Sequence, residues 1–234
     1  MTGVFIGRGI TPVIPVGGLS LSIGDDGEMK ATVTLHIHYD LCSKWLEIAA
    51  RHLSDAKERK LERVAAWTTD DEDAKGRTLE QEFEASMQAI MAAAIALDAF
   101  YATIKDKTNI PENTFRIWKA KKTARHAQIG EVLRQAYSLP PGCVKELKGA
   151  LSEIFKFRDW AVHPPGGIQA PVLHPEIGVG VEWRFVSFSA ESATLIVTNA
   201  QSIISDLTNK GKPSNPEIQR YTEGLRSLLA TALP

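Results

Sequence analysis

The residue types best suited to chemistry lie close together in one short string, FKFRDWAVHPPG. Arg158, Asp159 and His163 fall within six positions of one another. Histidine titrates close to neutral pH and can move a proton, whereas arginine carries a fixed positive charge with forked donors that suit an anion. Asp159 could orient either neighbour or could simply face solvent. This set of side chains is suited to proton transfer beside an anionic group.

A helix over about 144–162 must position this string. Its apolar side chains recur at steps of three and four along one face, and the same steps lead next to Arg158, which is therefore expected on the core stripe. Pro164 disfavours helical geometry at His163, so the helix is expected to stop there. Positions five apart on an ideal helix diverge by about 140°, so Arg158 and His163 share a face only if the helix loosens at His163. The apolar residues of the stripe are Val144, Leu147, Leu151 and Ile154.

The remaining periodicities predict a mainly α protein, a helical bundle with a small antiparallel sheet. Residues 19–39 alternate with period two around Asp26-Gly27, which predicts a hairpin with one face buried, and alternation near 177–187 offers a possible third strand. Helices are expected after Asp40, over 83–104 with an unbroken apolar seam, after Pro111, after Ser189 and after Asn215-Pro216. We expect residues 1–78 to form the hairpin and a helix packed on a helical domain of residues 79–234.

The string from Arg158 to His163 resembles the R-x4-H motif of the HEPN superfamily, the higher eukaryotes and prokaryotes nucleotide-binding domains. It matches the motif residue by residue, with a polar residue after the arginine and a proline after the histidine. The resemblance covers roughly residues 79–207 and implies a HEPN-like helical bundle. The 19–39 hairpin lies outside it and resembles a family-specific addition.

The resemblance implies a metal-independent endoribonuclease. In such enzymes two subunits place two R-x4-H pairs in a shared cleft, and a ribose 2′-hydroxyl attacks the adjacent phosphate to give a 2′,3′-cyclic phosphate. His163 would be the general acid or base, Arg158 would stabilise the phosphorane, and Asp159 would orient one of them. The implied partners are RNA, a second copy of the chain, and an antitoxin or regulatory protein. Toxins paired with a minimal nucleotidyltransferase usually carry a tyrosine two residues after the histidine, where this chain has Pro165.

A basic stretch supplies the positive charge that an RNA substrate requires. Between positions 105 and 134 there are eight basic residues against three acidic ones, in a chain whose formal net charge is −1. Taken alone, such a run favours a solvated helix face, and it favours RNA contacts only if it opens onto the same cleft as the motif. The expected RNA contacts are Arg116, Lys119, Lys121, Lys122 and Arg125.

The composition of the chain excludes several classes of protein. Near-neutral charge excludes a bulk-basic nucleic-acid coat, and two cysteines are too few for a disulfide framework, which favours a reduced cytoplasmic compartment. We expect no signal peptide, no membrane span, no cofactor and no metal site. His36 and His38 share one side of a strand without an evident third ligand. Asp98, inside an apolar helix, either faces water or bonds a neighbouring helix.

Two other functions remain open at this stage. A non-catalytic HEPN-like module would bind a nucleotide, RNA or a protein and keep Arg158 as an anion contact. A pure interaction protein would use the seam over 83–104 for dimerisation. A buried His163 whose hydrogen bonds are made within the helix would favour the binding module.

Overall fold

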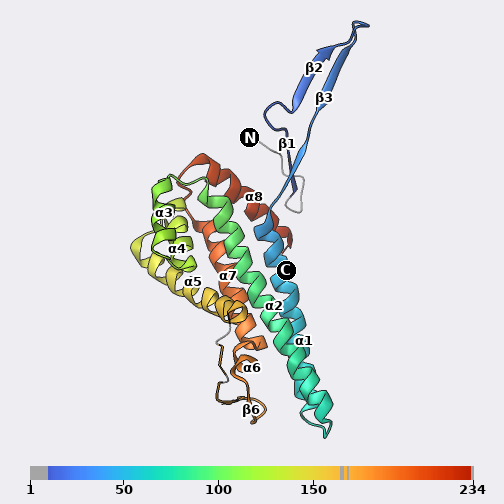
Figure 1. Cartoon of the computed structure of the whole chain (residues 1–234), viewed down its shortest axis with the longest axis vertical. Coiled ribbons are helices and arrows are strands. Elements are labelled where there is room, and N and C mark those ends of the chain that lie inside the picture. The colour runs from blue at the N-terminus through green and yellow to red at the C-terminus, as the bar shows by residue number, and fades with distance from the viewer. Residues whose placement is uncertain (1–9, 164–165, 168, 233–234) are drawn as a thin grey trace.

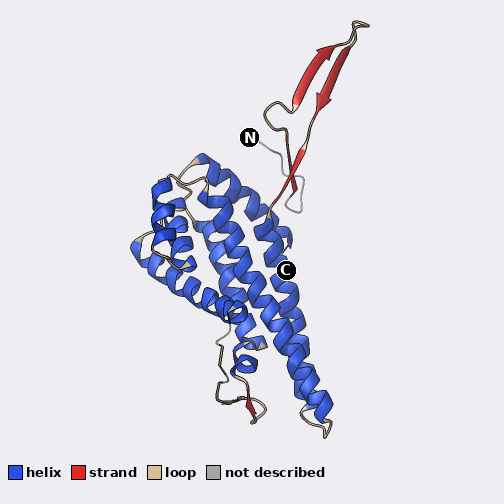
Figure 2. Cartoon of the chain, in the orientation of Figure 1, coloured by secondary structure: helices blue, strands red, loops and turns tan. Residues whose placement is uncertain are grey.

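The chain forms a helical bundle from which a two-stranded ribbon projects (Figure 1). The computed structural model describes residues 10–163, 166–167 and 169–232. Helices dominate, and the strands form three separate two-stranded antiparallel sheets, so the expected mainly α class with small antiparallel sheets is confirmed (Figure 2). The helices are α1 Leu41–Ala66, α2 Glu72–Lys105, α3 Glu112–Ala120, α4 Arg125–Ala136, α5 Pro141–Val162, α6 Trp183–Ser187, α7 Ala190–Lys210 and α8 Pro216–Ala232.

Two long helices, α1 and α2, lie side by side in antiparallel orientation and form the spine of the bundle. Helix α2 is central, because α4, α5 and α7 also pack on it. Small side chains on α2 let these neighbours approach closely, and its larger apolar residues fill the core between them. The fully buried residues of α2 include Ala89, Ala93, Ala96, Leu97, Phe100 and Ile104.

Helix α2 is also long and apolar enough, by length and composition alone, to cross a membrane. Just over half of its most apolar stretch, 56%, is buried inside the bundle. The same apolarity serves the core of the protein, which is a common property of central helices in helical bundles.

The helix starts follow local capping chemistry. The carboxylate of Asp40 accepts from the backbone N–H of Ser43 at 2.9 Å, and the hydroxyl of Ser189 accepts from that of Ser192. The side chain of Asn215 accepts from the backbone N–H of Ile218 at 3.0 Å, ahead of Pro216 at the first helical position. These three predicted helix starts are confirmed.

The hairpin exists, but its expected burial is wrong. Strand β2, Leu19–Ile23, pairs with β3, Met29–Val33, across a turn in which Gly27 has φ +78°. Strand β1, Ile10–Val13, pairs with β4, His36–Tyr39, and extends the same ribbon toward the bundle. All of β2, β3 and β4 is exposed, because the ribbon extends beyond the end of the bundle instead of lying on it.

The third strand expected near 177–187 is not part of this ribbon. Only Gly180–Val181 is extended there, as β6, and it pairs with β5, Val172–Leu173. The chain then turns into α6, which contains Trp183 and Phe185. The turn from His174 to Val179 lets β5 and β6 pair locally. Closing this short loop costs less chain entropy than pairing with the distant hairpin, so the local pairing forms.

The expected boundary between residues 78 and 79 falls within α2, which runs unbroken from Glu72 to Lys105. Helix α1 packs along α2 for much of its length, and both contribute to one hydrophobic core.

Candidate functional site

The last turn of α5 carries the predicted catalytic residues. The helix ends at Val162, and His163 follows in a non-helical conformation with φ −129° and ψ 64°. Its backbone N–H still donates to the carbonyl of Asp159 at 2.7 Å. The predicted end of the helix at His163 is therefore confirmed. The prolines of the string, Pro164 and Pro165, lie outside the described residues.

Arg158 does not continue the core stripe. The four apolar residues before it on that stripe are buried as predicted, but the Arg158 side chain is 33% exposed, so its expected place in the core is wrong. Its Nη1 donates to the carboxylate of Asp159 at 2.8 Å. The long charged side chain of Arg158 avoids desolvation by turning toward solvent, and the carboxylate of Asp159 holds it there.

His163 is exposed, as is Asp159. The structure brings Arg158 and Asp159 into contact, whereas His163 is linked to them only through its backbone. In a single chain the three residues form an accessible group at a helix end rather than an enclosed site. The feature that would favour the binding module, a buried His163, is absent.

An aromatic cluster fixes this end of α5. Trp160 contacts Phe157 and, across the chain, Trp183 of α6, with ring centroids 5.2 and 5.4 Å apart. Phe157 in turn meets Phe188 edge to face at 6.1 Å. Such ring pairs add packing energy beyond area burial. The face of α5 that bears Phe157 and Trp160 is therefore anchored, and the motif residues lie on the remaining surface.

The predicted RNA contacts are not brought to the motif. Arg116 and Lys119 lie on α3, and Lys121 and Lys122 follow it in a turn where Lys122 has φ +51°. All four are exposed and have no ion pair among the described residues. In Figure 1, α3 lies at the outer edge of the bundle, away from the end of α5 that points toward α6.

Arg125 has a structural partner instead. Its Nε donates to Asp98 of α2 at 2.5 Å, and its guanidinium lies 4.0 Å from the ring centroid of Tyr101. Asp98 therefore bonds a neighbouring helix, which was one of the two expected roles for a carboxylate inside an apolar helix.

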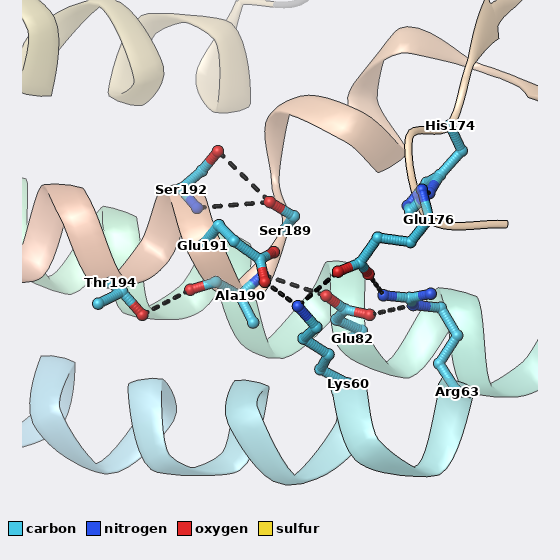
Figure 3. A network of polar contacts seen from close by, with 10 residues as sticks. All are labelled: Lys60, Arg63, Glu82, His174, Glu176, Ser189, Ala190, Glu191, Ser192 and Thr194. Atoms are coloured by element: carbon cyan, nitrogen blue, oxygen red, sulfur yellow. Dashed lines mark hydrogen bonds and ion pairs between the residues drawn. The ribbon is translucent and has the colours of Figure 1, made fainter. Parts of the chain in front are cut away.

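An ion network around the buried Arg63, which the sequence did not reveal, joins α1, α2 and the loop that carries His174 and Glu176 (Figure 3). Arg63 of α1 is only 1% exposed, and its Nε donates to Glu82 of α2 at 2.5 Å. Its Nη2 donates to Glu176, which also accepts from Lys60 of α1 at 2.6 Å. The other oxygen of Glu82 accepts from the backbone N–H of Ala190 at 3.1 Å, so Glu82 caps α7 from a different helix.

Two groups in this network have altered proton affinities. Burial alone would raise the pKa of Glu176, but hydrogen bonds from Lys60 and Arg63 outweigh it and lower the pKa of this carboxyl. Burial, assisted by the charge of Arg63, lowers the pKa of His174. His174 is 3% exposed, and its Nδ1 accepts from the backbone N–H of Glu176 at 3.3 Å. The network therefore holds the loop after the motif against α1 and α2, with His174 neutral.

Helical spacing was the signal that could have located this network. On α1 the buried residues Cys42, Ala49, Ala56 and Arg63 recur every seven positions. On α2 the buried residues Thr78, Glu82, Ser86 and Ile90 recur every four. A charge on each stripe predicts that the two charges meet in the interior.

Two hollows lie elsewhere on the bundle. One of about 650 Å³ runs between α1 and α7 with Lys60 and Leu61 on its wall, and one of about 700 Å³ lies between α5 and α7 with Cys143 and Leu147 on its wall. Neither is lined by Arg158 or His163. Among the described residues, no group of three His, Cys, Asp or Glu side chains is arranged to hold a metal ion.

Comparison of the chain with protein-family models, with curated proteins and with solved structures gives no match.

Proposed function

We propose that the protein is a metal-independent endoribonuclease whose active site forms when two copies bring their α5 ends together. The observation that carries this proposal is the end of α5: an exposed histidine directly after the last helical residue, with an arginine and an aspartate in the preceding turn. The anchored aromatic face leaves this group turned outward, where a second copy can reach it.

The proposed reaction is transfer of a phosphoryl group from the 5′-oxygen of one nucleotide to the 2′-oxygen of its neighbour. A base removes the 2′-hydroxyl proton, the 2′-oxygen attacks phosphorus, and the 5′-oxygen leaves with a proton from an acid. Two copies supply two His163 side chains, one for each proton transfer. The Arg158 guanidinium, which keeps further N–H groups beyond its bond to Asp159, stabilises the negative charge on the phosphorane.

Cleavage of a labelled structured RNA in excess EDTA tests this proposal. We expect metal-independent cleavage with 2′,3′-cyclic phosphate ends, reduced by about 100-fold or more in His163→Ala and in Arg158→Ala. Lys145→Ala is the matched control, since Lys145 is an exposed basic residue in the opposite half of the same helix. It should cleave like the parent protein. Circular dichroism and sedimentation must show that the variants keep their fold and association state.

Two results would overturn the proposal: no cleavage across several RNAs, or cleavage that survives both substitutions. RNA binding without cleavage, weakened by Arg158→Ala, would instead support the alternative, a non-catalytic HEPN-like binding module. In that case Arg158 would serve as an anion contact only.

A further inference from the structure

The ribbon formed by β1 to β4 carries apolar residues along one face of its two strand pairs, and no described residue buries them. Residues directly opposite in an antiparallel pair share a face, and the register places Leu19 opposite Val33, Leu21 opposite Ala31 and Ile23 opposite Met29. Closer to the bundle, Ile10 lies opposite Tyr39. We define the ribbon face as Ile10, Leu19, Leu21, Ile23, Met29, Ala31, Val33, Leu35, Ile37 and Tyr39.

The exposure of this face is unusual. Ile23 is 77% exposed, Met29 76% and Ile37 73%, and every other member is classed as exposed too. The opposite side of the ribbon carries polar residues, including Ser20, Ser22, Lys30 and Thr32. A sheet with one apolar side and one polar side usually packs its apolar side on a core. An isolated two-stranded hairpin is marginally stable in water, so this face requires a cover.

We infer that the cover is the same face of a second copy, so that two ribbons pack face to face as a small sandwich. The ribbon face has no charged residue and no unpaired charge to match, so its complement must be a flat apolar sheet surface of similar length and twist. A second ribbon has these properties by identity. Two-fold packing of identical patches is also the commonest way in which proteins form homodimers.

The dimensions predict a weak pair. Residues 29–39 form the long side of the ribbon, and at about 3.3 Å per residue and about 10 Å across two strands this length presents roughly 350 Å². Two copies would then cover about 700 Å², below the range of stable interfaces, so the association should be weak and reversible on dilution. The ribbon extends beyond the bundle, so a second ribbon can approach without meeting the helices (Figure 1).

This interface is separate from the contact between α5 ends. The ribbon leaves the bundle where α1 begins and α8 lies, whereas the end of α5 points toward α6 at the other side of the molecule. The inference therefore goes beyond the proposed nuclease, and either can fail without the other.

Sedimentation equilibrium of the full chain over a range of concentrations tests the ribbon contact. Leu21→Glu places a charge within the ribbon face and should weaken association by about 100-fold or more, which halves the mass in the affected range. Ser22→Glu is the matched control, since Ser22 lies on the polar side opposite Lys30, and it should leave the mass unchanged. A monomeric parent protein, or equal masses for parent and Leu21→Glu, would overturn the inference.

Crosslinking tests the face-to-face geometry. In a Cys143→Ser background, which removes the exposed thiol, a short bis-maleimide should join Val33→Cys copies efficiently and Thr32→Cys copies poorly. Val33 lies near the middle of the ribbon face, where a two-fold axis brings identical residues closest. Equal crosslinking of the two variants would exclude this packing. RNA cleavage measured on Leu21→Glu in parallel shows whether the α5 site depends on the ribbon.

Discussion

Arg63 and Glu82 meet inside the bundle, with Nε of the arginine 2.5 Å from Oε2 of the glutamate and both side chains less than 5% exposed. The pair joins α1 to α2, and its further bonds reach Glu176 and the start of α7. One guanidinium nitrogen, Nη1, has no hydrogen-bond partner in the described structure. The pair therefore joins α1, α2, the Glu176 loop and the start of α7.

Removal of either partner should destabilise the protein strongly. Arg63→Met leaves the buried Glu82 with only the backbone N–H of Ala190 and leaves Glu176 with Lys60, so the buried negative charge of Glu82 loses its cation. We expect a loss of roughly 3–5 kcal/mol in the free energy of unfolding. Urea denaturation followed by circular dichroism measures it. The double variant Arg63→Met/Glu82→Gln should lose less than the sum of the single variants, because it leaves no buried charge from this pair. Additive losses would show that the two side chains act independently.

Stability should depend on pH through His174. Its folded pKa is lowered from 6.5 by burial and by Arg63, so the unfolded chain takes up a proton that the folded protein resists. The stability that the neutral His174 gives the folded protein is therefore fully present above about pH 6.5 and is lost as the pH falls through the folded pKa. His174→Gln should flatten the dependence of unfolding free energy on pH in this window.

RNA binding should depend on the exposed basic residues of α3 and its following turn. Substitution of Arg116, Lys119, Lys121 and Lys122 by alanine should weaken binding and lower the slope of log affinity against log salt by up to about 3. Fluorescence anisotropy at several salt concentrations measures both quantities. Arg125→Ala is an informative comparison. Because Arg125 is bound to Asp98 and Tyr101, its loss should reduce stability and leave the salt slope nearly unchanged.

The aromatic anchor should control the order of the α5 end. Trp183→Ala removes the ring against which Trp160 packs, so the backbone amides of residues 158–163 should exchange with deuterium about 10-fold faster. Trp67 caps the C-terminal end of α1 and provides the control. Trp67→Ala should not alter the exchange of residues 158–163. Unchanged exchange in Trp183→Ala would assign the order of this turn to the helix itself.

A hydrogen bond between the last helix and the start of the first should contribute to stability. Tyr221 of α8 donates to the buried carboxylate of Asp40 at 2.8 Å. Tyr221→Phe leaves that oxygen short of a donor, and we expect a loss of about 1–3 kcal/mol in thermal or urea unfolding. The exposed Tyr39 provides the control, since Tyr39→Phe should change the unfolding free energy by less than about 0.5 kcal/mol.

Features with local causes could be predicted from the sequence. The caps at Asp40, Ser189 and Asn215 depend on side chains within three residues of the N–H groups that they bind, and each was predicted. The end of α5 at His163 follows from the next residue in the chain. The place of Arg158 was missed because a long charged side chain on an apolar stripe can still bend toward solvent.

Features with distant causes could not be predicted in the same way. Arg63 lies in the charged run KERKLER, which locally resembles a solvated surface, and its burial depends on Glu82 and on Glu176, 113 residues further along. The alternation of apolar and polar residues over 177–185 predicts a strand, but it does not say whether that strand pairs with the hairpin or with a nearby segment. The separation of α3 from the α5 end depends on how whole helices pack, which no local pattern encodes.

Asp40 is the single residue between the ribbon and the bundle, since β4 ends at Tyr39 and α1 begins at Leu41. Its two carboxylate oxygens are held by Ser43 and Tyr221, so the junction is clamped on both sides. The direction in which the ribbon leaves the bundle is therefore set at one residue, by bonds to the first turn of α1 and to α8.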